Sequence, residues 1–455
     1  MKNNPFLLLA ASLSLAMIFT FSCSGDGNVI DSISNSGGSE VWDGRINTTW
    51  YDDSKKEFTI TTAQQLAGLA KLVNDGAGFA GKTVKLGKTI NLSKIEWTPI
   101  GNCEVGFTGI FDGNGYEIIG VSVNNPDSSC QGFFRGLEYG GEIKNLGIVD
   151  SYIRGNEEVG GIAGYNNSKI SNSYFTGAVA GANMIGGLVG FNYPGTISNS
   201  YSTGTIAGDT AVGGLVGYNY QGTINNSYSK GTVSGNVYIG GLAGLTYQST
   251  ISNSYSTSTV VSFFRGGGFV GHSDGEISNS YSTGAVTGDS IVGGFVGVNF
   301  GEISNSYSTG AVKGDTVAGG FVGWNNVGAS MSNNYSIGKV SGYINVGGFV
   351  GFNSGEISNS YSAGTVSGLA GMSGTLVVLG GFAGGSRTGI GSVISNSFYD
   401  KEKNSQIESY GGTGKTTAQM KEQATYTDWD FSKVWGLSST VNSGYPYLRS
   451  VVGSK

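Results

Sequence analysis

The sequence has little of the side-chain chemistry that metal sites and many catalytic centres use. Among its 455 residues there are 3 cysteines and 1 histidine, His272, and charged residues make up only 12%. Sites that need several histidine or cysteine ligands are therefore excluded, and we expect no cofactor. The net charge is −6 and no cluster of Lys and Arg interrupts the chain. Nucleic acid is not an expected partner, because phosphate binding depends on such clusters.

Proline is also scarce, with 5 residues, whereas glycine is abundant, with 81. A collagen triple helix would need far more proline and a glycine at every third position. A disordered linker would lack the 38% hydrophobic and 11% aromatic residues that this chain contains. The glycines therefore belong to a chain that folds.

An internal repeat explains where many of the glycines lie, and its period of about 27 residues is typical of a solenoid. Asn-Ser-Tyr, or a close variant, recurs at nearly constant steps between positions 158 and 399, and a Gly-Gly pair precedes each copy. Each unit holds three short pieces rich in β-branched or aromatic residues, which predicts three strands. Stacked units bury an apolar face that a single unit cannot. The sequence therefore predicts an all-β fold, a parallel β-helix (β-solenoid), rather than a β-propeller, whose blades have four strands and usually about 40 residues or more.

Residues at the same place in successive units are expected to stack in columns along the solenoid. The predicted core consists of an isoleucine column that includes Ile197 and Ile224 and a second, mostly valine column that includes Val179 and Val233. The asparagines at places equivalent to Asn192 are expected to form a ladder of amide hydrogen bonds. The tyrosines of the Asn-Ser-Tyr tripeptide could stack inside the solenoid or line its outside, and alternation along one strand does not decide between these.

The start of the chain differs from the rest. Residues 1–22 are typical of an export signal, with Lys2 before an apolar run from Phe6 to Phe21. Cys23 follows this run directly and resembles the acylated cysteine of a bacterial lipobox; ordinary signal-peptidase cleavage is the alternative. Residues 23–40 then form a polar linker. We expect an extracytoplasmic protein at the bacterial cell surface, held to the outer membrane by a lipid on Cys23, or else secreted.

Segments on either side of the repeats are expected to cap the solenoid, because an uncovered strand edge invites aggregation. Residues 41–157 predict an N-terminal cap and the first irregular coils, with a helix that begins at the capping box Thr62-Ala63-Gln64-Gln65. Residues 400–455 predict a second cap, in which Thr416-Thr417-Ala418-Gln419 begins a helix and residues 444–448 form a closing edge strand. The solenoid should therefore have helix-containing caps at both ends.

Two cysteines, Cys103 and Cys130, lie one repeat length apart in the sequence. They could therefore occupy the same place on successive coils, at a distance that suits a disulfide. Two free thiols in a loop are the alternative. Because disulfides persist in exported proteins, we expect the bond.

One column offers candidate binding residues. It follows the third repeat glycine and varies between copies, which favours an exposed position; packing in the core or at a corner is an equal alternative. Aromatic side chains aligned along a rod could dock sugars or protein surfaces. The column contains Tyr165, Phe191, Tyr218, Leu245, His272, Val298, Trp324 and Phe352.

Another column contains Glu276, Glu302 and Glu356. Paired carboxylates could do acid-base work or hold calcium, as in a polysaccharide-acting enzyme. These glutamates are spaced by whole coils at expected solvated turns, and no set of Asp, Arg and Lys converges with them. We therefore expect charged turn residues here, with no catalytic and no metal site.

The cores Gly187-Leu188-Val189-Gly190 and Gly214-Leu215-Val216-Gly217 resemble those of the GLUG-motif family of bacterial surface proteins. The resemblance implies a β-helical, adhesin-like protein at the cell surface. Some members of that family carry a zinc peptidase domain, whose His-Glu-x-x-His site needs two histidines and so does not fit this chain. We expect a non-enzymatic, monomeric adhesin that binds an extracellular glycan or protein. A polysaccharide-acting β-helix enzyme and a purely structural spacer are the alternatives.

Overall fold

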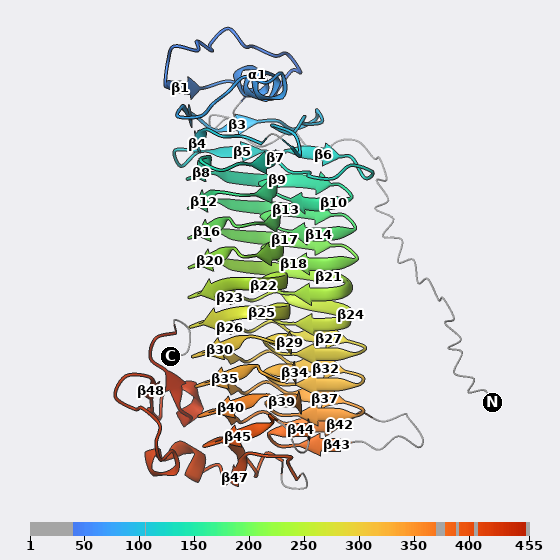
Figure 1. Ribbon diagram of the computed structural model, residues 1–455, viewed down its shortest axis with the longest axis vertical. Coiled ribbons are helices and arrows are strands. Elements are labelled where there is room, and N and C mark those ends of the chain that lie inside the picture. Colours follow the sequence, from blue (N-terminus) through green and yellow to red (C-terminus); the bar gives the residue numbers. More distant parts are fainter. Residues whose placement is uncertain (1–39, 105, 370–377, 388–390, 405–407, 452–455) are drawn as a thin grey trace, which may run out of the picture. The chain divides into compact units, whose positions relative to one another are not determined.

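The computed structural model describes residues 40–451, apart from 105, 370–377, 388–390 and 405–407. Over this range the chain winds into a parallel β-solenoid of about 12 coils with about 27 residues per turn (Figure 1). The predicted all-β parallel β-helix is therefore confirmed. The predicted export signal, Cys23 and the linker as far as residue 39 lie outside the described residues. None of the helices in the described ranges has the length and apolar character needed to cross a bilayer.

Each coil contributes strands to two sheets that enclose the core between them. In one regular coil, sheet 1 receives β11 (Ala163–Asn166) and β12 (Lys169–Ser171), and sheet 2 receives β13 (Tyr174–Ala180) and β14 (Asn183–Gly186). The next coil pairs with it in parallel through β15 (Val189–Asn192), β16 (Thr196–Ser198), β17 (Tyr201–Ala207) and β18 (Thr210–Gly213).

This coil therefore holds four strands, where the sequence predicted three. The missed strand precedes each Gly-Gly pair, as β14 does. Its second residue, Met184, has a left-handed backbone (φ 56°), as do Ala211 and Tyr238 in the following coils. This left-handed residue breaks the alternation by which a strand is recognised in a sequence, although the register with the neighbouring coils stays one to one.

The predicted isoleucine and valine columns fill the space between the sheets. Ile170, Ile197 and Ile224 lie in register on successive coils and are 0% exposed. On the opposite sheet Val179, Ile206 and Val233 are in register and no more than 2% exposed. Each such side chain contributes about 1.5–3 kcal/mol by leaving water, so the columns are the main source of stability.

The predicted amide ladder runs along sheet 1, inside the solenoid. Asn166 Nδ2 donates to Asn192 Oδ1 at 2.6 Å, and Asn192 Nδ2 donates to Asn219 Oδ1 at 2.6 Å. All three side chains are fully buried, so each bond satisfies an amide that would otherwise be costly in the core. Thr246 and Ser273 interrupt the ladder with a hydroxyl pair at 3.2 Å.

The Gly-Gly pairs occupy the corner where each coil passes from sheet 2 to sheet 1. A Cβ atom on Gly213 would lie 2.0 Å from the carbonyl oxygen of Val216, and one on Gly214 would lie 2.1 Å from that of Gly241. No side chain fits so close to the backbone, which is why glycine recurs here. Ser229, fully buried beside this corner, donates its hydroxyl to the Gly241 carbonyl.

The tyrosine column stacks on the outer face of sheet 2. Adjacent rings are 4.7 to 5.1 Å apart between centroids and within 1° to 7° of parallel. Their chain neighbours Ser202 and Ser229 point inward and are buried. We call this column the tyrosine ladder; its members are Tyr174, Tyr201, Tyr228, Tyr255, Tyr281, Tyr307, Tyr335 and Tyr361.

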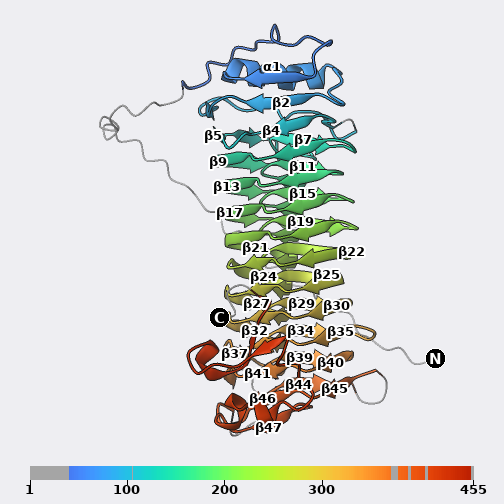
Figure 2. The same cartoon turned by 90° about the vertical axis from the view of Figure 1, so that its left-hand side faces the viewer.

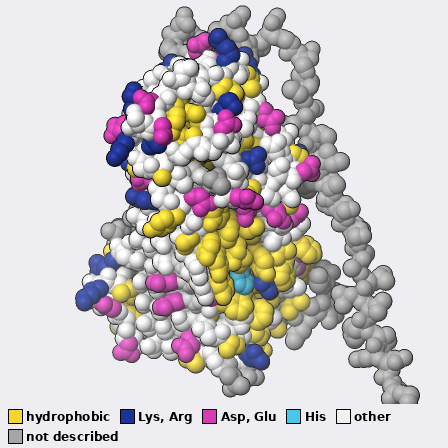
Figure 3. Space-filling model, turned by 45° about the horizontal axis from the view of Figure 1, so that its top comes forward, with side chains coloured by type: hydrophobic (Ala, Val, Ile, Leu, Met, Phe, Trp, Pro, Cys, Tyr) yellow, Lys and Arg dark blue, Asp and Glu magenta, His cyan; other side chains and the backbone are white. Residues whose placement is uncertain are grey.

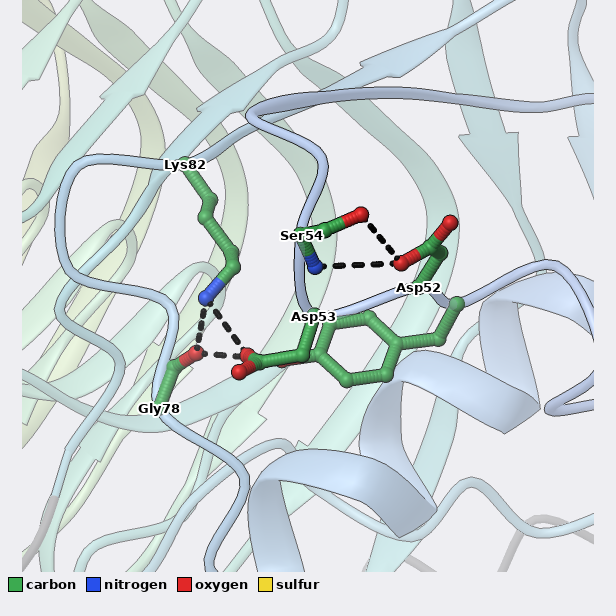
Figure 4. A network of polar contacts seen from close by, with 6 residues as sticks. Asp52, Asp53, Ser54, Gly78 and Lys82 are labelled. Carbon is green, nitrogen blue, oxygen red and sulfur yellow. Dashed lines mark hydrogen bonds and ion pairs between the residues drawn. The ribbon is translucent and has the colours of Figure 1, made fainter.

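The N-terminal end of the solenoid carries α1 (Ala63–Asn74), as predicted (Figure 1). Thr62 and Gln65 form the expected capping box, and Leu66 and Leu69 are completely buried against the first coils. Beside the helix, Lys82 Nζ lies 2.9 Å from Asp53 Oδ1 and 3.2 Å from the Gly78 carbonyl oxygen (Figure 4). These contacts fix the loop before β1 (Glu57–Ile60) against the one before β2 (Thr83–Leu86).

The predicted helix in the C-terminal cap is wrong. The only helical elements among the described residues of this segment are the short 3-10 turns η1 (Gln419–Lys421), η2 (Gln423–Thr425) and η3 (Asn442–Gly444). The residues expected to begin the helix do bond each other: Gln419 N donates to Thr416 Oγ1 at 3.2 Å and Thr416 N donates to Gln419 Oε1 at 3.0 Å. No apolar stripe like that of α1 follows, so a helix here would bury nothing, and burial supplies most helix stability in proteins.

The C-terminal segment folds back along the solenoid and covers the last rungs of the tyrosine ladder (Figures 1 and 2). Its strands β48 (Trp435–Gly436) and β49 (Tyr447–Leu448) pair only with each other, and antiparallel. Tyr361 donates its hydroxyl to the Pro446 carbonyl at 2.6 Å, and Ser450 Oγ reaches Asn279 Oδ1 at 3.0 Å. Residues 444–448 therefore do not close a sheet edge as predicted.

Cys103 and Cys130 are joined by a disulfide with their Cα atoms 5.7 Å apart. Its reduction is expected to lower the free energy of unfolding of the first coils by about 3.5 kcal/mol, because the bond closes a loop of 27 residues. Denaturant unfolding with and without reductant measures the change. The double variant Cys103→Ser, Cys130→Ser is the control and should not respond to reductant. Alkylation of both thiols in unfolded, non-reduced protein would contradict the bond.

Candidate functional site

The predicted binding column lies on the outer face of sheet 1. Its members occupy the same place on successive coils, from Tyr165 to Phe352, in continuous parallel register. They alternate with the buried asparagines, so they point away from the core. The strands that carry the column are β11, β15, β19 (Val216–Tyr220), β22 (Ala243–Ser252), β25 (Val270–Ser278), β29 (Val296–Asn299), β34 (Val322–Asn325) and β39 (Val350–Asn353).

Seven of the eight members are half-buried and reach solvent, which excludes core filling for them. They are Tyr165, Phe191, Tyr218, Leu245, His272, Trp324 and Phe352. Val298 differs, since it is only 1% exposed. Both alternatives that the sequence left open therefore occur in this column: the aromatic members are partly exposed, and this valine is packed away from solvent.

Two further columns that the sequence analysis missed flank this one. The first contains Tyr193, Tyr220, Tyr247 and Phe300, two residues further along each coil. Alternation with period two could have found it, because residues i and i+2 of a strand share a face. The second lies at the left-handed residue before each Gly-Gly pair and includes Tyr238 and Arg265, with φ of 61° and 60°. Only the structure shows that the side chains at this place contact residues of sheet 1, as both do with His272.

Together the three columns form what we call the aromatic strip. Figure 3 shows apolar side chains gathered along this face of the solenoid, with the histidine among them. Rings on neighbouring coils contact each other. The distance between ring centroids is 5.3 Å for Phe191 and Tyr218, 5.4 Å for Tyr220 and Tyr247, and 5.0 Å for His272 and Phe300. These contacts form three groups along the strip, from Tyr165 to Tyr247, around His272, and at Trp324 and Phe352. An apolar patch on a solvent-facing sheet is typical of an interaction surface.

The rings of the aromatic strip are less uniform in orientation than those of the tyrosine ladder. Tyr165 is inclined by 48° to Phe191, and Trp324 by 88° to Phe352, whereas Tyr220 and Tyr247 are stacked at 15°. In the tyrosine ladder near-parallel stacking covers both faces of each inner ring. The inclined rings of the strip leave parts of their faces free, and ring faces are the surfaces on which an apolar ligand face can stack.

Arg265 and His272 form a polar centre within the aromatic strip. The Arg265 guanidinium carbon lies 5.2 Å from the ring centre of Tyr238 and 4.9 Å from that of Phe264. Its Nη1 is 3.2 Å from the Tyr238 hydroxyl and 3.3 Å from His272 Nδ1. Burial, and then the charge of Arg265, lower the pKa of His272 to about 4. The imidazole is therefore neutral at neutral pH, and because guanidinium only donates, Nδ1 accepts and Nε2 carries the proton.

The candidate catalytic glutamates form no converging site. Glu276, Glu302 and Glu356 are exposed on sheet 1, and Glu276 lies in register with Glu302 one coil away. Within the residues that the structure describes, no group of three or more His, Cys, Asp and Glu side chains could hold a metal ion. These observations fit charged surface residues.

The family described as "Glug: The GLUG motif" matches residues 155–180, 181–207, 208–234, 235–261, 264–287, 288–313 and 342–367. Halomucin of Haloquadratum walsbyi is 33% identical over 129 residues, which cover 26% of this chain and 1% of halomucin. A protein of Evansella cellulosilytica named "Putative Gly-rich membrane protein" is 36% identical over 80 residues, 17% of this chain and 9% of that protein. The chain thus spans only a small part of these relatives.

Two solved structures are similar over much of the chain. One, from Bacteroides ovatus, is called a "putative immunoglobulin A1 protease"; it has a TM-score of 0.35 and 19% identity, covering 88% of this chain and 94% of that one. The other, "IgA1 Protease", has a TM-score of 0.30 and 18% identity, covering 67% and 21%. Neighbours named as enzymes point against a non-enzyme, so the expectation of a non-enzymatic chain is corrected. Likeness this weak transfers no activity to the chain.

Proposed function

Because the chain is a GLUG-motif repeat protein whose coils align the rings of the aromatic strip, we propose that it is a surface-associated binding protein that holds an extracellular glycan on that strip. The names of its relatives, halomucin and a Gly-rich membrane protein, support association with a surface or membrane. Acylation of Cys23, an outer-membrane location and a monomeric state belong to the same proposal.

The observation that carries the proposal is the set of partly exposed aromatic rings on the outer face of sheet 1. The apolar face of a sugar ring stacks on an aromatic face, whereas its hydroxyls seek polar partners at the edges. Seven coil steps separate Tyr165 from Phe352, so the strip is about 34 Å long at about 4.8 Å per step. A surface of that length can hold several units of an extended polymer at once. Repeated weak contacts then add to a useful affinity.

Replacing Tyr193 and Tyr220 together by alanine is expected to weaken glycan binding about 30-fold, because each ring contributes about 1 kcal/mol. Retention on a glycan array, followed by titration calorimetry with the retained glycan, measures the change. The matched control is Tyr152→Ala, which removes a tyrosine that is 39% exposed from β9 (Gly147–Arg154) on sheet 2.

Equal losses in the double variant and the control would count against the strip. Retention of matrix proteins but of no glycan would replace the glycan by a protein surface. A reducing-end assay on the bound polymer tests separately whether the chain also cuts what it holds.

A further inference from the structure

The aromatic strip contains a cation that no acid of the described residues neutralises. Arg265 lies at the end of β24 (Thr259–Gly267), and among the described residues it forms no ion pair. Its Nε is buried without a hydrogen-bond partner. Placing a guanidinium in an apolar environment costs free energy unless hydrogen-bond acceptors or an opposite charge compensate it. Its position within the aromatic strip therefore suggests that a ligand supplies the missing charge.

The aromatic neighbours hold this guanidinium in place. Tyr238 and Phe264 contact it through their ring faces, and the Tyr238 hydroxyl and His272 Nδ1 accept from Nη1. These two bonds use both hydrogens of Nη1, and Nε is buried, so Nη2 is the donor left for a ligand; it donates to no group of the described part of the chain. A charged donor of this kind bonds a carboxylate more strongly than it bonds a hydroxyl.

His272 adds a second donor beside the first. Its ring lies 5.4 Å from Tyr238 and 5.0 Å from Phe300, so it is fixed between two coils. With Nδ1 accepting from Arg265, the proton stays on Nε2, and the imidazole can donate to an oxygen without carrying charge. Arg265 and His272 thus both offer hydrogen-bond donors at one place on the strip.

Two acidic residues lie on the other side of this place: Asp274 and Glu276 follow His272 on β25, whereas Arg265 precedes it. Asp289, one coil further on, lies on the same side as Arg265, next to Ser290, whose nitrogen donates to the Phe263 carbonyl; it is exposed and forms no ion pair with Arg265 within the described residues. Asp274 takes the place in its column that Tyr247 holds one coil earlier. We therefore expect an anionic group of the ligand to bind beside Arg265. Hydroxyl groups of the ligand could donate hydrogen bonds to Asp274 and Glu276 on the other side of His272.

We propose that Arg265 and His272 anchor the carboxylate of an acidic polysaccharide, such as a uronic acid polymer, whose sugar rings lie along the aromatic strip. This inference rests on the proposed glycan binding and narrows it to one ligand class. The carboxylate supplies the counter-charge that the guanidinium lacks, and neighbouring sugar rings cover the aromatic faces on the coils before and after it.

The test compares polygalacturonate with its fully methyl-esterified form, which has the same backbone without the charge. The wild type should bind the acidic form about tenfold more tightly at low salt, and this preference should fall as salt is added. Arg265→Gln should remove the preference, whereas Arg265→Lys should keep part of it because the charge remains. Lys230→Gln removes an exposed cation from sheet 2 and should leave the preference intact.

The outcomes separate this inference from the proposed function. Equal affinity for both polymers, or an unchanged preference in folded Arg265→Gln, would overturn the carboxylate anchor while glycan binding stands. Failure of every polymer to bind would overturn the proposed function itself. Tighter, Arg265-dependent binding of poly-glutamate than of polygalacturonate would assign the anchor to an acidic protein segment and contradict the polysaccharide. Unfolding midpoints of all variants establish that the comparison concerns folded protein.

Discussion

Gly213→Ala should destabilise the solenoid by about 3 kcal/mol or more. The added Cβ atom would meet the Val216 carbonyl oxygen at 2.0 Å and the Ala243 Cα and Gly244 nitrogen of the next coil at 2.7 Å. All three are backbone atoms, so no side chain can rotate away to make room. Relief requires two coils to separate, which would disrupt the parallel pairing of Val216 with Ala243.

The matched control for this substitution is Gly78→Ala. A Cβ atom there would have no heavy atom within 4 Å, and the backbone is not left-handed. This variant should be as stable as the wild type or more stable by up to about 1 kcal/mol, because alanine restricts the unfolded chain. Denaturant midpoints of the two variants, followed by far-ultraviolet circular dichroism, measure the difference. Similar midpoints would show that the corner yields more easily than its geometry indicates.

Trp435→Ala should release the C-terminal segment from the solenoid. The indole is fully buried and lies 4.5 Å from the ring of Trp429 and 6.0 Å from that of Tyr361. Truncating a buried tryptophan costs about 3–5 kcal/mol. The segment packs mainly through this aromatic cluster on the outer face of sheet 2, so the cost falls on local rather than global unfolding.

Hydrogen exchange resolved along the chain measures this effect. Amides of residues 419–451 should lose protection in Trp435→Ala, whereas those around Ile224 should keep theirs. Tyr139→Ala, which removes an aromatic ring that is 87% exposed, is the control and should change neither region. Loss of protection throughout the chain would mean that the segment and the coils unfold as one unit.

The periodic part of the structure could be predicted because the same residue recurs at the same place in each unit. Ile197 and Asn192 sit where their columns required, since the stacking of coils places identical residues in register. The aromatic members of the binding column were found in the same way. Their exposure could not be derived from the repeat. A residue that faces solvent and a residue that packs at a corner both recur once per coil, so the spacing does not distinguish them.

Most repeat units do not indicate whether the tyrosines of the ladder face the core or the solvent. The residue that points inward beside each tyrosine is a serine, such as Ser202 or Ser229, so no apolar alternation marks the core. The first copy held the signal: Phe175 stands in register with Ser202 and with Ile148 of the preceding coil, and both apolar residues are fully buried.

Two other features depend on contacts without a period. Arg265 reaches the aromatic strip because its backbone is left-handed at a place in the repeat that no residue preference marks. The C-terminal segment reaches the tyrosine ladder through bonds such as that of Tyr361 with Pro446, 85 residues apart. A single sequence carries no signal for such a pairing, whereas the disulfide pair shows itself by spacing.

The tyrosine ladder has a consequence for how such a chain can change in length over evolutionary time. The C-terminal segment rests on Tyr307, Tyr335 and Tyr361, and the preceding rungs present the same side chain at nearly the same spacing. Recombination between similar gene segments can add or remove a whole repeat. After such a change the C-terminal segment would still find the same kind of tyrosine surface on which to pack. Each such event would lengthen or shorten the aromatic strip by one coil, about 4.8 Å, and so set how much polymer one molecule can span.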